Sequence, residues 1–459
     1  MRIIICGAGQ VGTSIARQLA MEGNDVSVID QSSGQIQKIS DTLDVIARVG
    51  CASHPTVLEE VGAHEADMMI AVTFSDEVNM IACQVAHSLF NIPTKIARIR
   101  NQNFLKSEWG HLYREDHLPI DYISSPEMEV AKAVIHRLHV PGAVDTIPFA
   151  DGLLKVIGMR CTLECPVIHM GLARIQQKLA HLNVSILGVM REENFIITNN
   201  AIDLCADDEL YFTAESKHVQ QVMAILGHEE KEAHRIVIIG GGNIGLYLAE
   251  HFEREARDVR VKLIEINKER AEYVAEHLSK TTVINGDALS QEILEEVNVA
   301  HAETLIAVSN DDEVNILSSL LSKRSGCQRV ITLVTNAASY SPLISSLGVD
   351  VVVNPKEITV STILQHVRKG QILAARSICK GKAEIIEAQA IRSSPVIGKT
   401  LSELSLPTEI IVGAIIRDNE VIIPNKETVL EDRDRLIMLT QARGVRQVER
   451  IFSVKFEFF

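Results

Sequence analysis

The stretch Ile3-Ile4-Ile5-Cys6-Gly7-Ala8-Gly9-Gln10-Val11-Gly12, which continues through a helical pattern to Val26-Ser27-Val28-Ile29-Asp30, decides the fold. An apolar run of β type leads into a G-x-G-x-x-G turn. The turn opens a helix, and a second apolar run then ends in a carboxylate. This strand–turn–helix–strand order is the context that a dinucleotide-binding fingerprint requires. The sequence therefore predicts a nucleotide site at the turn.

Each part of this fingerprint has its own task. Gly7 permits the tight turn, Gly9 lets a pyrophosphate approach the backbone, and Gly12 lets the helix pack closely on the strand. Asp30 is expected to hydrogen-bond a ribose diol, and an acid there favours NAD over NADP because a 2′-phosphate would meet like charge. Free N–H groups and the helix dipole favour phosphates. The predicted contacts therefore include the residues between the glycines: Ala8, Gln10 and Val11.

The fingerprint occurs a second time. Residues 236–239 lead into Gly240-Gly241-Gly242-Asn243-Ile244-Gly245, and the run 261–265 ends in the acid Glu265. Further on, Gly50-Cys51-Ala52 matches Gly286-Asp287-Ala288, and residues 71–79 match residues 307–315. One such motif is weak evidence by itself. Two copies that match at the glycine turn, the acid, the G-x-A run and residues 71–79 and 307–315 predict two nucleotide-binding lobes.

Strand and helix patterns alternate in both lobes, which is typical of a doubly wound parallel sheet. The strands of the first lobe are expected to end near Cys6, Asp30, Val49, Thr73, Arg100 and Ile123, with a helix over 104–114 among the others. After each lobe the pattern changes to short β-type runs with an amphipathic segment. The fold class is therefore α/β, with two Rossmann-like domains, each followed by a small α+β domain. The predicted bounds are 1–139, 140–231, 232–368 and 369–459.

Composition restricts the class of protein. The 459 residues carry a net charge of −15, which argues against a general nucleic-acid surface. No uninterrupted apolar run approaches the roughly 18 residues that span a bilayer. The chain opens directly on the strand and glycine turn, so we expect no signal peptide and a cytoplasmic protein. The eight cysteines are dispersed and indicate reduced core residues.

The other binding residues predicted in the first lobe lie at the ends of its third, fourth and fifth strands: Cys51, Ala52, Thr73, Phe74, Ser75, Arg98 and Arg100. A strand sends residues i and i+2 to one face, so the two arginines are expected to meet a polyphosphate together. The alternative is an exposed arginine pair matched to local acids. In the second lobe the predicted residues are Glu265, Asp287, Ala288 and Ser309 besides the glycine turn. Leu333 and Thr335 replace the arginines there, so the two sites are not expected to be equivalent.

Three further features leave alternatives open. Residues 76–79 and 312–315, which both read D-E-V-N, either cap a helix or contact a ligand or a neighbouring lobe. The set Cys161, Cys165 and His169 lacks a standard zinc spacing, so strand and turn packing is favoured and no metal site is predicted. The first lobe has a six-residue insertion between Asn101 and Asp121, and its Trp109 either contacts a partner or anchors a helix.

The residues also resemble a known family. The opening 1–12, with Cys83-Gln84-Val85-Ala86, 96–100 and 236–245, resembles the regulatory subunits of Trk potassium-uptake systems (the TrkA family), which carry a tandem pair of RCK (KTN) domains. The resemblance covers essentially the whole chain. It implies that 1–139 and 232–368 are RCK N-terminal domains, and that 140–231 and 369–459 are RCK C-terminal (TrkA-C) domains.

What the resemblance implies about function goes beyond the residues. It implies a regulatory subunit without catalytic residues, peripheral to the inner face of the cell inner membrane, which gates a potassium-channel membrane subunit of the TrkH/TrkG type. It implies gating through conformational change that depends on NAD(H) and on ATP or ADP, and a tetramer of identical chains. The residues alone leave an NAD-dependent oxidoreductase or a nucleotide-binding assembly protein open. A dehydrogenase needs a group for proton transfer, and the small domains present no matched His, Lys or Tyr.

Overall fold

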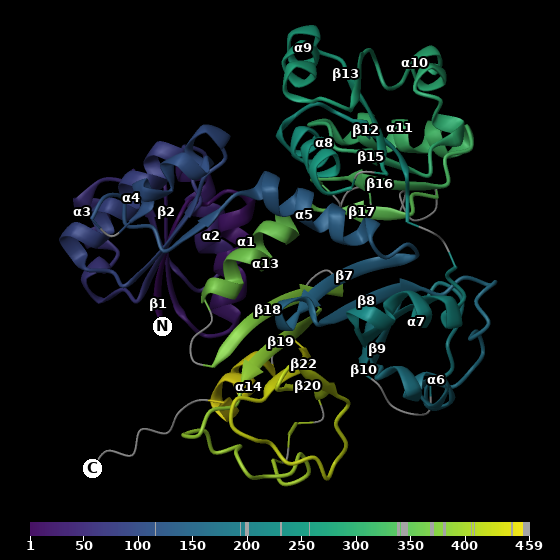
Figure 1. Ribbon diagram of the computed structural model, residues 1–459. Coiled ribbons are helices and arrows are strands. Elements are labelled where there is room, and N and C mark those ends of the chain that lie inside the picture. Colours follow the sequence, from purple (N-terminus) through teal and green to yellow (C-terminus); the bar gives the residue numbers. More distant parts are fainter. Residues whose placement is uncertain are drawn as a thin grey trace. The chain divides into compact units, whose positions relative to one another are not determined.

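The computed structural model describes residues 1–114, 116–192, 194–197, 202–229, 232–256, 258–336, 340, 348–367, 371–379, 382–404, 406–407, 409–441 and 444–452 (Figure 1). The chain forms two compact units. One contains Met1–Lys132 and Ala233–Val367, and the other contains Ala133–Glu232 and Arg368–Phe459. Each unit therefore combines segments from both halves of the sequence. The four predicted domain bounds stay a prediction, and residues 231, 368 and 369, at two of them, lie outside the described residues.

The first lobe is a six-stranded parallel sheet in the order β3-β2-β1-β4-β5-β6. Its strands are β1 (Arg2–Cys6), β2 (Asp25–Asp30), β3 (Ile46–Val49), β4 (Met68–Ala71), β5 (Thr94–Arg98) and β6 (Tyr122–Ser124). Its helices are α1 (Gln10–Met21), α2 (Ser33–Thr42), α3 (Pro55–Glu60), α4 (Asp76–Phe90) and α5 (Pro126–Leu138). The central strands are buried on both faces, which explains their continuous Ile and Val runs.

The second lobe repeats this sheet in the order β14-β13-β12-β15-β16-β17. Its strands are β12 (Arg235–Ile239), β13 (Arg260–Glu265), β14 (Thr282–Asn285), β15 (Thr304–Ala307), β16 (Arg329–Leu333) and β17 (Val351–Val353). Its helices are α8 (Asn243–Glu255), α9 (Lys268–His277), α10 (Gln291–Glu296), α11 (Asp312–Arg324) and α13 (Pro355–Val367). Two Rossmann-like sheets, as predicted, are therefore confirmed.

Helix α13 belongs to the second lobe in sequence but covers the first lobe. Its apolar residues Val360, Ile363, Leu364 and Val367 are buried in the same core cluster as β1, β2 and α1. The ring of Tyr122 on β6 stacks on His366 of α13, with 3.4 Å between the ring centroids. The core of the first lobe is thus completed by a segment from the far end of the second lobe.

The other unit contains two antiparallel five-stranded sheets, β10-β9-β11-β8-β7 and β18-β19-β22-β20-β21. The first consists of β7 (Ala143–Phe149), β8 (Leu154–Arg160), β9 (Ser185–Arg191), β10 (Asn194–Ile197) and β11 (Glu209–Glu215), with α6 (Leu172–Leu179) and α7 (Val219–Leu226). The second consists of β18 (Ile372–Ile378), β19 (Ala383–Gln389), β20 (Ile410–Arg417), β21 (Glu420–Ile422) and β22 (Arg435–Gln441), with α14 (Val445–Phe452). The predicted α+β character of both small domains is confirmed.

An ion pair between a buried aspartate and a half-buried arginine recurs in these two sheets. Nε and Nη2 of Arg191 donate to the two carboxylate oxygens of Asp208 at 2.9 and 2.8 Å. Arg417 and Asp434 form the same pair at 2.8 and 2.7 Å. Such two-bond pairs are stronger than single contacts because both partners are charged and geometrically matched. Both small domains therefore contain the same arginine–aspartate contact at equivalent positions.

Two local predictions were wrong. Residues 104–114 do not form an α-helix but lie in two 3₁₀ segments, Gln102–Leu105 and Ser107–Tyr113. Gly110 disfavours a helix by about 1 kcal/mol, and the side chains that contact the core are irregularly spaced. Strand β5 also ends at Arg98, so Arg100 lies beyond it and the expected alternation of the two arginines along one strand does not occur.

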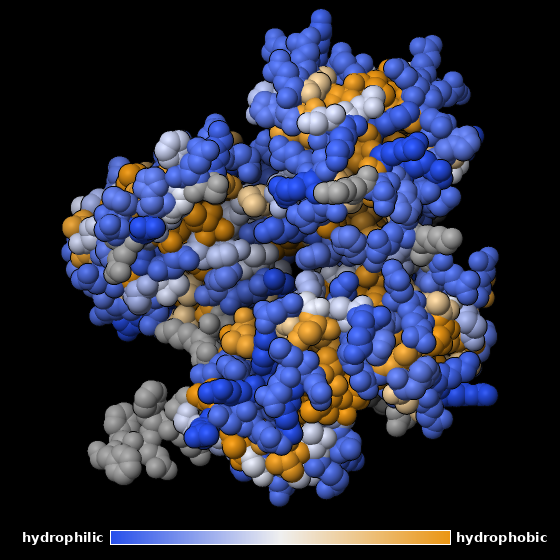
Figure 2. Space-filling model, in the orientation of Figure 1, coloured by the Kyte–Doolittle hydropathy of each residue, from blue (hydrophilic) through white to orange (hydrophobic). Residues whose placement is uncertain are grey.

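On the face shown in Figure 2, hydrophilic side chains predominate and apolar ones are scattered among them. Throughout the described ranges, no helix combines the length and the apolar composition that crossing a membrane requires.

Candidate functional site

A cavity of about 1390 Å³ lies within the unit that holds both parallel sheets. Residues from both glycine turns line it. The predicted site residues that line it are Gly7, Gly9, Gln10, Val11, Asp30, Ala52, Thr73, Phe74, Ser75, Arg98, Arg100, Gly240, Gly242, Asn243, Ile244, Glu265, Asp287, Ala288 and Ser309. The predicted residues outside the lining are Ala8, Gly12, Cys51, Gly241 and Gly245.

The first and third glycines of each turn are required by the backbone itself. Gly7 and Gly240 have φ angles of +112° and +100°, which side chains of other residues rarely adopt. A Cβ atom on Gly12 would lie 1.9 Å from the carbonyl oxygen of Gly7, and one on Gly245 would lie 1.9 Å from that of Gly240. These glycines therefore hold the helix against the strand.

The second glycine of each turn has a different environment. A Cβ atom on Gly9 or Gly242 would meet no described atom within 4 Å, so the fold does not explain why these residues are glycine. Each is the N-cap residue of its helix, α1 or α8, and neither first turn carries an acid. Open space next to the positive end of a helix suits the close approach of a phosphate.

The acid at the end of each second strand supports the glycine turn. Asp30 accepts hydrogen bonds from the backbone N–H groups of Ala8 at 2.6 Å and Ser32 at 2.8 Å. Glu265 accepts equivalent bonds from Gly241 at 2.6 Å and Asn267 at 2.8 Å. A carboxylate has about four acceptor positions, so both acids keep capacity for a ribose hydroxyl.

The loops after β4 and β15 are fixed by one buried asparagine each. Through Oδ1, Asn79 accepts a hydrogen bond from the backbone N–H of Thr73 at 2.9 Å. Through Nδ2, it donates to the carbonyl oxygen of Arg98 at 2.9 Å. In the second lobe, Asn315 accepts from the backbone N–H of Ser309 at 2.8 Å and donates to the carbonyl oxygen of Leu333 at 3.1 Å. These contacts hold the ends of neighbouring strands together at the rim of the cavity.

The two D-E-V-N segments, residues 76–79 and 312–315, hold neighbouring backbone in place. The hydroxyl of Ser75 accepts from the N–H of Val78 at 3.2 Å and caps α4. Asp76 instead accepts from the N–H groups of Arg100 and Asn101, at 3.0 and 2.8 Å. In the second lobe, Asp311 caps α11 by accepting from the N–H of Val314 at 2.9 Å. Asp312 is the counterpart of Asp76 and accepts from the N–H of Thr335 at 2.8 Å.

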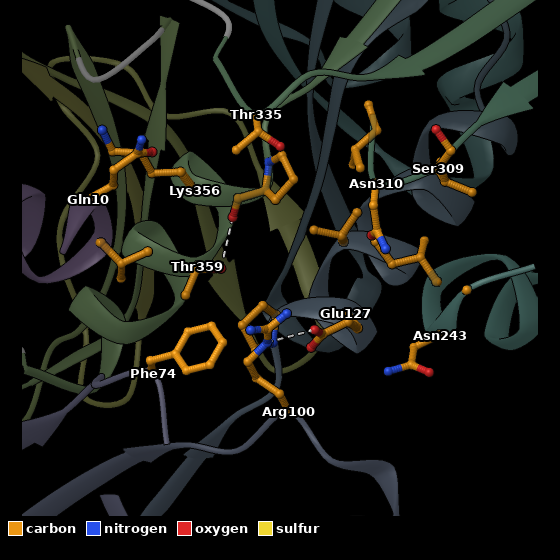
Figure 3. A pocket seen from close by; sticks show the side chains of 18 of the residues that line it. Gln10, Phe74, Arg100, Glu127, Asn243, Ser309, Asn310, Thr335, Lys356 and Thr359 are labelled. Atoms are coloured by element: carbon orange, nitrogen blue, oxygen red, sulfur yellow. Dashed lines mark hydrogen bonds and ion pairs between the residues drawn. The ribbon is translucent and has the colours of Figure 1, made fainter. Parts of the chain in front are cut away.

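The two arginines of the first lobe differ in their contacts. Arg98 is half-buried and donates to the carbonyl of Thr73 at 2.7 Å. Burial, and next the positive charge of Arg100, lowers the pKa of Arg98. Arg100 pairs with Glu127 of α5 at 3.1 Å and lies 5.8 Å from the ring centroid of Phe74 (Figure 3). The positive charge at this edge is thus partly balanced by one acid.

Sequence reasoning missed two cations that line the cavity from the second lobe. Arg270 of α9 donates through Nε to the carbonyl oxygen of Gly241 at 2.7 Å. Lys356, in the first turn of α13, appears in Figure 3 on the same side of the view as Gln10 of the first glycine turn. The first had no matching signal in the repeat, because its counterpart in the first lobe is the uncharged Gln35. The second depends on where α13 packs and had no local signal.

The residues that follow the third strands also differ. The thiol of Cys51 lies 3.2 Å from the hydroxyl of Ser53, and this hydrogen bond lowers the pKa of Cys51. Its counterpart Asp287 lines the cavity and accepts from the N–H of Leu289 at 2.9 Å. The second lobe therefore presents an extra acceptor where the first presents none.

The other motif singled out from the sequence packs as structure. Cys161 and Cys165 are buried in the core of the first small domain, and His169 has a φ angle of +60° in a turn. Across the described ranges, no three His, Cys, Asp or Glu side chains gather as a metal site would require.

A family model named TrkA-N domain matches residues 3–126 and 236–355, and one named TrkA-C domain matches residues 385–453. A Trk system potassium uptake protein TrkA from Azorhizobium caulinodans is 46% identical over 459 residues, covering 100% of both chains. Another from Halomonas elongata is 39% identical over 463 residues, again covering 100% of both.

Among solved structures, the fold is similar to that of the GsuK channel, with a TM-score of 0.61 over 98% of this chain and 78% of that chain, at 20% identity. A structure of the GsuK channel bound to NAD gives a TM-score of 0.59 at 19% identity, with the same coverage. The GsuK RCK domain gives 0.60 over 98% and 94%, at 19% identity. At this level of identity the similarity establishes the fold.

Proposed function

Because the chain belongs to the TrkA family of Trk system potassium uptake proteins, we propose that it is a nucleotide-binding regulatory subunit that gates a membrane potassium channel. The observation that carries this proposal is the cavity onto which both glycine turns open. Gly9 and Gly242 leave space at two helix N-termini that have no side-chain cap, and Asp30 and Glu265 line the same cavity. Two nucleotide sites on one cavity suit a sensor, because a nucleotide bound at either site lies in a cavity that residues of both lobes line.

NAD(H) and ATP or ADP are the proposed ligands. The acid that ends each second strand suits a ribose diol, and the glycine turn suits a pyrophosphate. Arg98 and Arg100 supply two positive charges to the first-lobe site, which favours a ligand with several phosphates. The GsuK channel has been solved with NAD, and this supports a dinucleotide on the shared fold.

Gating requires a ligand that favours one arrangement of the lobes over another. A ligand that binds one state about 100-fold more tightly shifts the equilibrium by roughly 2.7 kcal/mol per site. Contacts between the lobes pass through α13, whose first turn contributes Lys356 and Thr359 to the cavity. Ligand contacts to that turn would bear directly on the helix that completes the first lobe.

The proposed setting is the cytoplasmic face of the cell inner membrane. There the chain would form a homo-tetramer and bind a TrkH/TrkG-like channel subunit, so that it is peripheral to the membrane through this partner. The names of the relatives and the duplicated architecture support a role in regulation rather than catalysis. In a closed oligomer, the shifts in the conformational equilibrium that ligand produces at the several sites would add together.

The test combines binding with transport. NADH, ATP and ADP are titrated calorimetrically into the full chain and into Gly9→Val and Gly242→Val variants, and potassium flux is measured in vesicles containing the channel subunit. We expect each variant to lose one class of site and the double variant to lose nucleotide control of flux. Normal nucleotide-dependent flux with both turns blocked would refute the proposal.

The alternative is an NAD-dependent oxidoreductase. Among the described residues that line the cavity there is no His or Tyr, although Lys356 and several acids are present. Incubation of NADH with carbonyl substrates distinguishes the two functions. Substrate-dependent loss of the absorbance of NADH at the rate of an enzyme would favour the oxidoreductase.

A further inference from the structure

Each lobe carries an arginine–aromatic pair, but on opposite sides of its glycine turn. In the first lobe, Arg100 lies 5.8 Å from the ring centroid of Phe74, in the loops after β5 and β4. In the second lobe, Arg270 lies 4.8 Å from the ring centroid of Tyr273, both on α9 after β13. The duplicated sites therefore place their arginine–aromatic pairs after different strands of the repeated sheet.

The guanidinium of Arg270 is held in place from two directions. Its Nε donates to the carbonyl of Gly241 at 2.7 Å, while one face lies over the Tyr273 ring. The residue still lines the cavity, as does Ile266, whose side chain is 70% exposed directly after the acid Glu265. An apolar side chain and a fixed guanidinium plane thus border the space next to the ribose acid.

The first lobe provides an internal comparison. There the carbonyl equivalent to that of Gly241 belongs to Ala8, and it accepts a hydrogen bond from the Thr13 hydroxyl at 2.9 Å. The counterparts of Ile266, Arg270 and Tyr273 are Gln31, Gln35 and Lys38. The second lobe has Leu246 in place of Thr13, so Arg270 takes over the support of the turn and adds a flat surface.

Building on the proposed nucleotide function, we propose that Arg270 is the base-stacking residue of the second-lobe site, where its guanidinium plane holds the adenine of the bound nucleotide. The adenine end of a nucleotide lies beyond the ribose acid, where Arg270 and Ile266 border the cavity. Guanidinium planes stack on flat aromatic groups. The carboxylate of Asp287 is an acceptor suited to an exocyclic amine, and Cys51 replaces it in the first lobe. The second site thus recognises the base, whereas the first recognises phosphates.

The test isolates the second site in the Gly9→Val full-length chain and uses AMP as the probe. Arg270→Gln with Leu246→Thr restores a hydroxyl partner for the Gly241 carbonyl, and Arg270→Lys keeps the charge without the plane. Loss of base stacking lowers affinity by roughly 5- to 150-fold. We expect AMP affinity to fall about tenfold or more in both variants by calorimetry, with unchanged melting temperatures.

The reverse exchange guards against a purely structural effect. In the Gly242→Val chain, Gln35→Arg with Lys38→Tyr is expected to raise AMP affinity at the first-lobe site about fivefold. Parental AMP affinity in Arg270→Lys would overturn the inference in favour of charge alone. A selective loss of NADPH affinity in Arg270→Gln/Leu246→Thr would overturn it in favour of a 2′-phosphate contact. Absence of nucleotide binding in the unsubstituted chain would refute the proposed function as well.

Discussion

Asp30 accepts, through Oδ2, a hydrogen bond of 2.6 Å from the backbone N–H of Ala8, so the acid that we propose binds the ribose also fastens the glycine turn. Asp30→Ala should therefore weaken NADH binding at the first site and also lower the free energy of unfolding by about 1–2 kcal/mol, since the buried N–H of Ala8 loses its partner. Calorimetry in the Gly242→Val chain and urea unfolding measure the two effects. Asp25→Ala, at the exposed start of β2, is the control. Unchanged NADH affinity would refute the ribose assignment.

The second and third glycines of the turn should respond in opposite ways to alanine. Gly12→Ala places a methyl group against the Gly7 carbonyl and should destabilise the first lobe by about 3 kcal/mol or more. Gly9→Ala meets open space, so stability should change by less than about 0.5 kcal/mol while nucleotide affinity falls. Thermal unfolding with and without NADH separates the two. A loss of stability in Gly9→Ala would show that the space is needed by the fold.

The buried aspartate in the ion pair of the second small domain predicts a measurable effect on stability. Asp434 is fully buried, and Asp434→Ala removes both the two-bond partner of Arg417 and the acceptor for the backbone N–H of Glu431. Arg417 is 25% exposed and keeps its ion pair with Glu431, so the free energy of unfolding should fall by about 2 kcal/mol. Asp432→Ala is the matched control because its partner Arg392 is 89% exposed, and it should change stability by less than about 1 kcal/mol. Chemical denaturation compares them. Equal effects would contradict the role assigned to burial.

Glu129 on α5 should make stability depend on pH. Burial raises the pKa of Glu129 to about 7, although its Oε1 accepts from Tyr122 and Ser124 at 3.2 and 3.1 Å. The folded state then holds the proton more tightly than the unfolded state. This group's contribution to stability therefore declines as pH rises from about 4.5 to about 7.

Glu129→Gln removes the charge and should flatten that decline. Relative to the parent, the variant should gain on the order of 2–3 kcal/mol above pH 7 and almost nothing below pH 4. Urea unfolding across this pH range gives the difference, and the exposed Glu276→Gln serves as the control. A gain that is the same at all pH values would exclude titration of Glu129 as its cause.

The parts of the site that could be predicted from sequence depend on short-range geometry. The spacing from Gly7 to Asp30 specifies a turn, a helix and a second strand that ends in an acid, and its repetition at Gly240 and Glu265 indicates the same unit. Both sheets confirm that fold. The strand limits were harder, because Arg100 follows β5 in a loop held by Asp76, a contact 24 residues away.

What could not be predicted depends on packing between distant segments. Nothing local in 355–367 distinguishes a helix that covers its own sheet from one that covers another lobe. The positions of Lys356 and Thr359 at the cavity follow from such packing. Arg270 was missed for a different reason. Its importance lies in replacing Thr13, and this exchange is visible only once both carbonyls are seen to be satisfied.

The position of α13 also constrains how the chain folds during synthesis. The first sheet is complete once Ser124 has been made, yet the core that contains Ile3, Ile5 and Leu19 also needs Ile363 and Leu364. At 5–20 residues per second, ribosomes reach α13 on the order of ten to fifty seconds later. During that interval the nascent first lobe exposes an apolar face. A chaperone bound to the emerging chain would find its target there.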